Sequence, residues 1–273
     1  MTQHHVIVPA WRRPGFLHAC LTRLIVADNG TARYTISIDR DGDTLNSLPI
    51  AMFTDAIGAD RVQISHRIHY YPGNSFNVLC ALTEASQDVT ADLVHIVEED
   101  VLVGFDHFAV HERMHSEYPA AFAASSCANQ NIEPAHVALL NAPFYTHPSY
   151  QSLAVSMRRE IAAKASEHLG IVYFSDPIGY CERVFPDSLI PRQNAEQDGL
   201  LNRIREREEM GTVYTAHPRA YHAGFTGYHR LGAELEGSPQ EQGEQILAMT
   251  ADELNAHAPE EFRDHTTCDL DPV

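Results

Sequence analysis

Three consecutive carboxylates, Glu98, Glu99 and Asp100, follow directly after the apolar run 93–97. The run is short, rich in β-branched residues and without helical periodicity, which predicts a buried strand. Open α/β sheets bind their ligands at the carboxyl ends of such strands. Adjacent carboxylates repel each other by roughly 4 kcal/mol at about 4 Å, and a divalent cation that holds a phosphate offsets this repulsion. The motif equally fits a polar turn between a strand and a helix.

Strands and helices alternate along the first half of the chain, and this order would place the acids at the edge of a sheet. The predicted strands of this half are residues 5–8, 34–38 and 61–64. We expect Pro9 to end the first of them. A helix is predicted at 14–27, with Pro14 in its first turn and Asn29-Gly30 after its last. A β-α-β-α-β succession is typical of a parallel sheet.

The remaining elements follow from the same patterns. Asn74 or Ser75 is the expected N-cap of a helix that ends near Gln87. The further predicted strands are residues 121–126, 137–140, 153–157 and 212–216. The further predicted helices are residues 105–112, 158–169 and 194–211. The stretch 231–273 is acidic with helical periodicity, so we expect a helical C-terminal extension there.

Composition limits the classes of function. The chain has 273 residues and a net charge of −18, enough length for one α/β domain with an appendage. The negative charge argues against a general binder of duplex nucleic acid. The five cysteines are scattered without a CxxC pair, which predicts no disulfide framework and a cytoplasmic protein. No apolar stretch is long enough to span a membrane, and the N-terminus has no leader-like segment.

The order of these motifs resembles a GT-A glycosyltransferase, and in particular the Golgi N-acetylglucosaminyltransferase family that begins complex N-glycans. The resembling parts are the strand ending at residues 8–14, the strand ending at 37–42 and the acidic motif 98–100. The segments 101–119 and 122–131 are also similar, so the likeness covers roughly residues 5–230. Glu99 stands where that family has Asp.

The resemblance implies a GT-A-type, Rossmann-like mixed and mostly parallel sheet flanked by helices. Residues 1–104 would be the nucleotide-sugar-binding half and 105–230 the acceptor half. The implied activity is metal-dependent, inverting transfer of a hexosyl or N-acetylhexosaminyl group from a nucleotide-sugar, with UDP-linked donors favoured and Mn²⁺ or Mg²⁺ as the cofactor. The acceptor stays open: a glycan, a lipid, a protein side chain, a small molecule or a modified DNA base.

The resemblance also assigns roles at the donor site. Asp100 would bind the metal directly, while Glu98 and Glu99 would orient metal waters and the donor sugar or ribose. Asp39 would accept a hydrogen bond from the nucleobase. The other candidates for donor binding are Pro9, Ala10, Trp11, Arg12, Gly73, Asn74 and Asn77.

Several of these residues have ordinary alternatives. Turn chemistry explains Asp39, core packing explains Trp11 and helix capping explains Asn74. Glu98 fits a strand-end carboxylate that pairs with an arginine.

An inverting transfer needs a base that takes the proton of the acceptor hydroxyl. Asp198, with Glu196 in reserve, matches the place of the catalytic acid in the resembling family, although acids also favour the first turn of any helix. His222, more than His217 or His229, matches a late histidine that binds metal or diphosphate in similar enzymes. A structural or exposed histidine is the alternative.

Two helical patterns are expected to be ordinary surface. His107, His111 and His115 are spaced at i, i+4 and i+8 and predict a solvated helix face. The pair His111/His115 could bind zinc, but no third ligand is near in sequence and there is no HExxH pattern. The charged run 203–209 predicts an exposed face with salt bridges.

Two other functions use the same features. A nucleotidyltransferase could use the acids for two-metal phosphoryl chemistry, although residues 10–15 match its Gly-rich, basic first loop only weakly. A non-catalytic module that binds a nucleotide-sugar is the third hypothesis. The products, or binding without hydrolysis of the donor, separate these alternatives.

Overall fold

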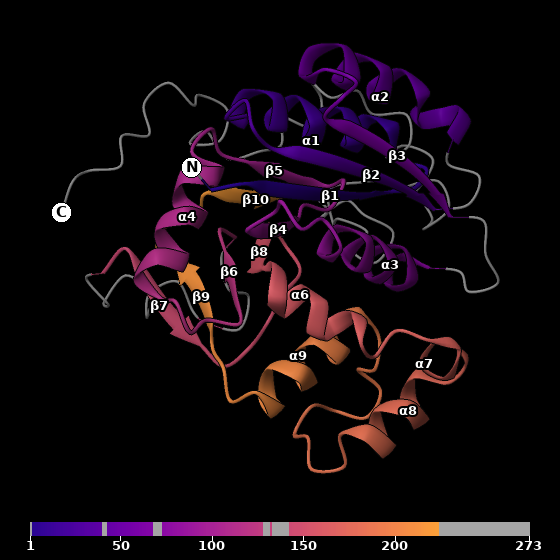
Figure 1. Ribbon diagram of the computed structural model, residues 1–273, viewed down its shortest axis with the longest axis vertical. Coiled ribbons are helices and arrows are strands. Elements are labelled where there is room, and N and C mark those ends of the chain that lie inside the picture. The colour runs from indigo at the N-terminus through magenta and orange to yellow at the C-terminus, as the bar shows by residue number, and fades with distance from the viewer. Residues whose placement is uncertain (1, 40–42, 68–72, 128–131, 133–141, 224–273) are drawn as a thin grey trace, which may run out of the picture.

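The computed structural model describes residues 2–39, 43–67, 73–127, 132 and 142–223. The strands of its main sheet are β1 (His4–Ala10), β2 (Arg33–Asp39), β3 (Val62–Arg67), β4 (Leu93–Ile96), β6 (Ala123–Ser125), β7 (Phe144–His147), β8 (Val155–Arg158) and β9 (Thr212–Thr215). They form one eight-stranded sheet in the order β3-β2-β1-β4-β8-β6-β9-β7 (Figure 1). Only β8 and β7 run antiparallel to their neighbours, so the sheet is mixed and mostly parallel, as predicted.

Helices cover both faces of this sheet (Figure 1). The helices are α1 (Pro14–Ala27), α2 (Asp43–Ile57), α3 (Asn74–Ser86), α4 (His107–Glu117), α6 (Arg159–Ser166), α7 (Ile171–Ser175), α8 (Pro177–Val184) and α9 (Gln197–Arg207). Successive residues of β1 point to opposite faces. Val6 and Val8 therefore pack in one core with α1 and α2, while Ile7 packs in a second core with α3, α6 and α9.

The first strand is longer than predicted, because β1 continues through Pro9 to Ala10. The pairing of β1 with β4 stops at Ile7 and Ile96, and the Val97 N–H donates to the Ile7 carbonyl. Beyond this point no β4 residue pairs with β1, so the missing N–H of Pro9 breaks no hydrogen bond between the two strands. The expectation that Pro9 ends the strand was wrong for this reason.

A small antiparallel ribbon that was not predicted joins two distant parts of the chain. Its strands are β5 (Val101–Val103) and β10 (Ala220–His222). The register places His222 opposite Val101, the residue that follows the acidic motif.

The expectation of an ordinary helix surface was wrong for the histidines of α4 and only partly right for the charged run 203–209. His107, His111 and His115 are buried in α4, with exposed fractions of 0%, 0% and 3%. Arg203 and Arg205 are also buried, and the Arg203 guanidinium donates to backbone carbonyls. The helix α9 thus packs Arg203 and Arg205 inward, where they donate to backbone carbonyls. Arg207 and Glu209 of the same run are exposed, and Glu208 pairs with Lys164.

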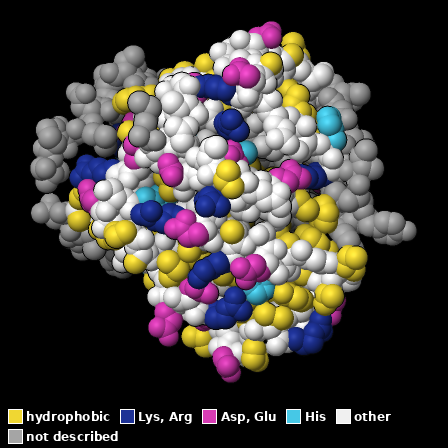
Figure 2. Space-filling view, in the orientation of Figure 1, with side chains coloured by type: hydrophobic (Ala, Val, Ile, Leu, Met, Phe, Trp, Pro, Cys, Tyr) yellow, Lys and Arg dark blue, Asp and Glu magenta, His cyan; other side chains and the backbone are white. Residues whose placement is uncertain are grey.

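Hydrophobic and charged side chains are distributed unevenly over the visible surface. Figure 2 shows hydrophobic side chains gathered in the region of α7 and α8 and basic side chains interspersed with acids elsewhere. Ile171, Val172 and Ile178 are the large exposed apolar residues of these two helices. Among the described helices, none combines the length and the hydropathy that a membrane crossing requires. The predicted strand 137–140 and the extension 231–273 lie outside the described residues.

Candidate functional site

Three parallel strands end at the same edge of the sheet. β1, β2 and β4 are parallel neighbours, so their carboxyl ends meet at this edge. Ala10 and Asp39 are the last residues of β1 and β2, and the acidic motif 98–100 follows β4. Asp39 is 6% exposed and Asp100 is 5% exposed. The sheet therefore brings the predicted nucleobase ligand and the predicted metal ligand to one edge.

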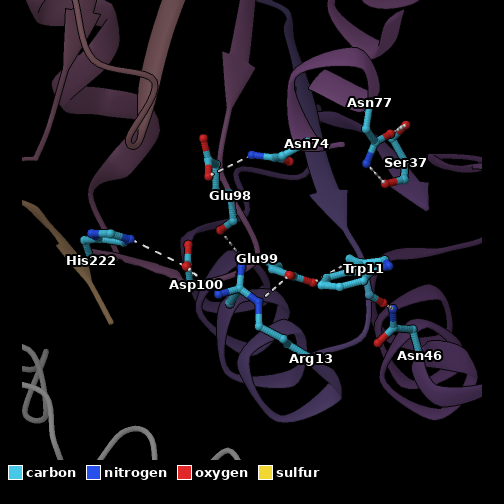
Figure 3. Close-up of polar contacts among 11 residues, drawn as sticks. Trp11, Arg13, Ser37, Asn46, Asn74, Asn77, Glu98, Glu99, Asp100 and His222 are labelled. Carbon is cyan, nitrogen blue, oxygen red and sulfur yellow. Dashed lines mark hydrogen bonds and ion pairs between the residues drawn. The ribbon is translucent and has the colours of Figure 1, made fainter. Parts of the chain in front are cut away.

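Arg13 is the main ionic partner of the motif. Its Nε donates to Glu99 Oε1 at 2.7 Å, and its Nη1 donates to Asp100 Oδ2 at 2.8 Å (Figure 3). The Trp11 backbone N–H donates to the other oxygen of Glu99 at 2.9 Å. The loop after β1 therefore neutralises part of the charge that repels the neighbouring acids.

Asp100 keeps one buried oxygen available. Its Oδ1 has no hydrogen-bond partner among the described residues, while its Oδ2 contacts Arg13 and lies 3.5 Å from His222 Nε2. Burial alone would raise the pKa of Asp100, but the Arg13 charge and the His222 contact hold it well below its ordinary value. Asp100 is therefore an anion with a free ligand atom, which fits the requirement of a divalent cation.

Glu98 points away from Arg13, toward the second half of the chain. Ser152 Oγ donates to Glu98 Oε1 at 2.9 Å, and Asn74 Nδ2 lies 3.4 Å from the other oxygen (Figure 3). Burial, followed by the charges of Asp100 and Asp198, raises the pKa of Glu98 to about 7. The expected alternative, an arginine partner for Glu98, is not what the structure shows, because the guanidinium goes to the next two acids.

Asp198 reaches the same place from the first turn of α9. Ser152 hydrogen-bonds it through side chain and backbone, so one serine contacts both Asp198 and Glu98. Packed neighbouring atoms raise the pKa of Asp198, and the two Ser152 hydrogen bonds oppose this rise. The side chain is exposed, so its desolvation is partial, and an incoming molecule can reach the carboxylate.

The start of α9 also meets the start of α3. Ser75 Oγ donates to Glu196 Oε2 at 3.2 Å and accepts from the Gln197 N–H at 3.3 Å. Gly73, with a φ of 121°, precedes α3 as its N-cap, so the expected capping by Asn74 or Ser75 was wrong. Their side chains bind acids instead.

The remaining predicted donor ligands lie around the first strands. Asn77 is buried, and it accepts from Ser37 Oγ at 2.5 Å and donates to the Ser37 carbonyl at 2.8 Å, which ties α3 to β2. Pro9 and Ala10 are buried in β1, while Arg12 is exposed. Trp11 is 40% exposed, so the expectation of core packing was wrong. Asn46 of α2 donates to the Trp11 carbonyl (Figure 3).

Sequence reasoning missed two residues at the centre of this arrangement. Arg13 stands beside the predicted Arg12, and its only signal was its place in the loop that faces the motif. Ser152 carried no signal, because one serine in a polar stretch is common. The structure brings together Glu98, Glu99, Asp100, Asp198, His222 and Asn74.

The donor set suits a hard divalent cation. Asp100 and Glu98 offer carboxylate oxygens, which Mg²⁺ and Mn²⁺ prefer, and the His222 imidazole favours Mn²⁺ of the two. The fit depends on the free Oδ1 of Asp100.

Similar solved structures include glycosyltransferases. S. aureus TarS has 14% identity and a TM-score of 0.48, and the match covers 94% of this chain and 43% of TarS, so this chain spans less than half of that protein. The mannosyltransferase PcManGT from Pyrobaculum calidifontis, solved with GDP-Man and Mn²⁺, has 14% identity and a TM-score of 0.47, with 93% and 70% covered. The galactosyltransferase LgtC, solved with donor and acceptor sugar analogues, has 11% identity and a TM-score of 0.48, with 95% and 99% covered.

No family model matches this chain, and no curated protein matches it. Likenesses at these identities and TM-scores assign neither a family nor an activity. The functional conclusion therefore depends on the geometry of the site.

Proposed function

We propose that this protein is a metal-dependent inverting glycosyltransferase that transfers a sugar from a nucleotide-sugar, with UDP-linked donors favoured, to a hydroxyl acceptor. The observation that carries the proposal is the contact of Ser152 with both Glu98 and Asp198, beside Asp100 and His222. A carboxylate suited to proton removal thus lies next to a group of ligands suited to a metal–diphosphate.

The donor would be held by residues 1–104. Asp100, His222 and Glu98 would hold Mn²⁺ or Mg²⁺, and such an ion, when bound, stabilises the charge of a departing diphosphate as a Lewis acid. Asp39, at the end of β2, would accept a hydrogen bond from the nucleobase, next to Pro9 and Ala10 on the neighbouring strand. Arg13 would hold Glu99 and Asp100 in place, and its positive charge would also favour an anionic donor.

The acceptor would enter from the side of residues 105–230. Asp198 takes the proton of the acceptor hydroxyl, the acceptor oxygen attacks the anomeric carbon, and the bond from that carbon to the diphosphate breaks. Attack from the side opposite the leaving group inverts the anomeric centre. Ser152 orients Asp198 for this step, and Glu196 is held by Ser75 at the margin.

A panel of UDP- and GDP-linked sugars, measured by thermal shift with and without Mn²⁺, tests donor binding, because a ligand that binds the folded state raises the Tm. The donor that stabilises most is then incubated with a panel of hydroxyl acceptors, and the products are identified by mass spectrometry. A transferred sugar with an inverted anomeric centre supports the proposal. In a parallel incubation with nucleoside triphosphates and sugar phosphates, release of pyrophosphate would make the protein a nucleotidyltransferase. Binding of nucleotide-sugars without any turnover would make it a binding module.

A further inference from the structure

Five histidines meet inside the molecule, away from the acidic edge. They are His4 on β1, His95 on β4 and His107, His111 and His115 on α4. Each is at most 3% exposed. Histidine is seldom fully buried, and a group of five around one point between a helix and a sheet needs a physical reason.

The spacing of three of these rings matches a metal centre. His95, His107 and His111 each offer a ring nitrogen, and these atoms lie within 4.8 Å of one another. His95 Nδ1 and His107 Nε2 are 3.2 Å apart. Two nitrogens bound to one tetrahedral zinc ion at about 2.0–2.1 Å are about 3.4 Å apart. The ring centroids, at 5.1, 5.1 and 4.4 Å, also converge on a common centre.

We propose that His95, His107 and His111 bind a transition-metal ion, with zinc as the best fit, in a structural site that joins α4 to β4. Imidazole nitrogens suit Zn²⁺, Co²⁺ or Ni²⁺, whereas Mg²⁺ and Ca²⁺ prefer oxygen ligands. This site is therefore chemically different from the carboxylate edge, and it does not depend on the proposed transferase activity.

The surrounding hydrogen bonds orient His95 as a ligand. His4 Nε2 lies 2.9 Å from Glu112 Oε1, and His4 Nδ1 lies 2.9 Å from His95 Nε2. An ionised carboxylate only accepts, so His4 donates to Glu112 and must accept from the N–H at His95 Nε2. The Nδ1 of His95 is then a bare lone pair that faces His107. A carboxylate that fixes the tautomer of a ligating histidine is the usual outer shell of a zinc site.

The other two rings can also serve as ligands. His107 Nε2 lies 3.2 Å from the lone pair of His95 Nδ1, so both atoms can bind one ion, and the proton of the His107 ring is then on Nδ1, which has no hydrogen-bond partner in the part of the chain that is described. His111 contacts Ser156 at 2.6 Å and Ser126 at 3.2 Å. Either serine keeps another partner if His111 turns one nitrogen to a metal, since Ser156 also contacts His115 and Ser126 also contacts the Ala154 carbonyl.

The burial of these three rings also favours the neutral form of imidazole, which is the form that binds a metal. Desolvation lowers the pKa of His95, His107 and His111, so the rings are neutral near pH 7 and no proton competes for the lone pairs.

Elemental analysis of the full-length protein, purified from zinc-supplemented medium, tests the site directly. The expected content is about one zinc ion per chain. His107→Gln should lose that ion, and the exposed His66→Gln, which lies on β3 outside the cluster, should keep it. Asp100→Asn should also keep the zinc, which separates this site from the acidic edge.

A second measurement covers the case in which His107→Gln fails to fold. Chelator-treated wild-type protein is titrated with Co²⁺, and a visible d–d absorption that saturates at about one equivalent is expected. Zinc in excess should raise the Tm of the same protein by roughly 5 °C. Purified protein without zinc, together with no cobalt absorption and no shift in Tm, would overturn the proposal and leave a metal-free network of hydrogen-bonded histidines. Loss of zinc in His66→Gln would also contradict it.

Discussion

His222 Nε2 lies 3.5 Å from Asp100 Oδ2, although the two residues are far apart in the sequence. The antiparallel pairing of β10 with β5 produces this contact, and the Ala223 N–H fixes it by donating to the Asp100 carbonyl at 2.8 Å. The last described strand thus completes a group of ligands that begins at the end of β4. Because each strand of this ribbon has only three residues, substitutions in β5 or β10 should alter the position of His222 beside Asp100.

Replacing Asp100 by Asn should abolish transfer and leave the fold intact. The amide has the size of the carboxylate but carries no charge for a cation, so we expect a loss on the order of a thousand-fold in metal-dependent turnover. Steady-state kinetics with added Mn²⁺, together with circular dichroism, measures this. The exposed Asp60→Asn is the control and should retain activity. Full Mn²⁺-dependent activity of Asp100→Asn would refute the assignment of this ligand.

Asp198→Asn should separate catalysis from binding. Removal of a general base typically lowers kcat by a factor on the order of 100 to 10,000, while donor affinity should stay near its original value. Calorimetry of donor binding beside single-turnover kinetics gives both quantities. Glu196→Gln should have the smaller effect, because Glu196 is bound to Ser75 at the margin. Simultaneous loss of binding and turnover in Asp198→Asn would instead show a structural role.

Arg13→Gln should destabilise the protein by about 3 kcal/mol at pH 7, because it leaves two buried carboxylates without their cation. Urea unfolding measures the change. Asp100 has a lowered pKa in the folded state, so it stabilises the fold above its ordinary pKa, and this contribution is lost as the pH falls toward the folded value. The deficit of Arg13→Gln should therefore shrink in acid. The exposed Arg12→Gln should change stability by less than about 0.5 kcal/mol.

Ser152→Ala should move the acidic limb of the pH–rate profile to higher pH. The Ser152 hydrogen bonds lower the pKa of both Glu98 and Asp198, and their loss raises both values. The base is active when deprotonated, so turnover then begins to rise at a higher pH. Profiles of kcat/KM for wild type, Ser152→Ala and a Ser149→Ala control measure the displacement. An unchanged limb in Ser152→Ala would show that neither acid governs the rate.

The folded state should also lose stability as the pH rises through neutrality. The raised pKa of Glu98 means that the folded state binds its proton more tightly than the unfolded chain does. This contribution is complete below the ordinary value of 4.5 and is lost as the pH passes about 7. Unfolding midpoints in urea between these two values should show the decline for wild type, and a smaller decline for Glu98→Gln.

Local pattern was sufficient for the elements that carry the acidic motif. The helical spacing after Pro14 predicted α1, and the apolar run before Glu98 predicted β4, because both depend on the period of one segment. The alternation of strands and helices also implied parallel strands whose carboxyl ends meet. The sequence pattern alone therefore predicted that Asp39 and the three acids lie at one edge of the sheet.

The contacts across the sheet could be decided only by the tertiary structure. Arg12 and Arg13 are adjacent and equivalent in the sequence. The path of the folded loop decides that Arg13 forms the ion pairs with Glu99 and Asp100. In the sequence, the histidines of α4 have the spacing of a polar helix face. In the structure, His95 of β4 lies against them. Sequence alone determined which residues share a strand or a helix face, since those periods are local. Which distant faces meet depends on register and on the packing of the whole core, so only the folded chain decided it.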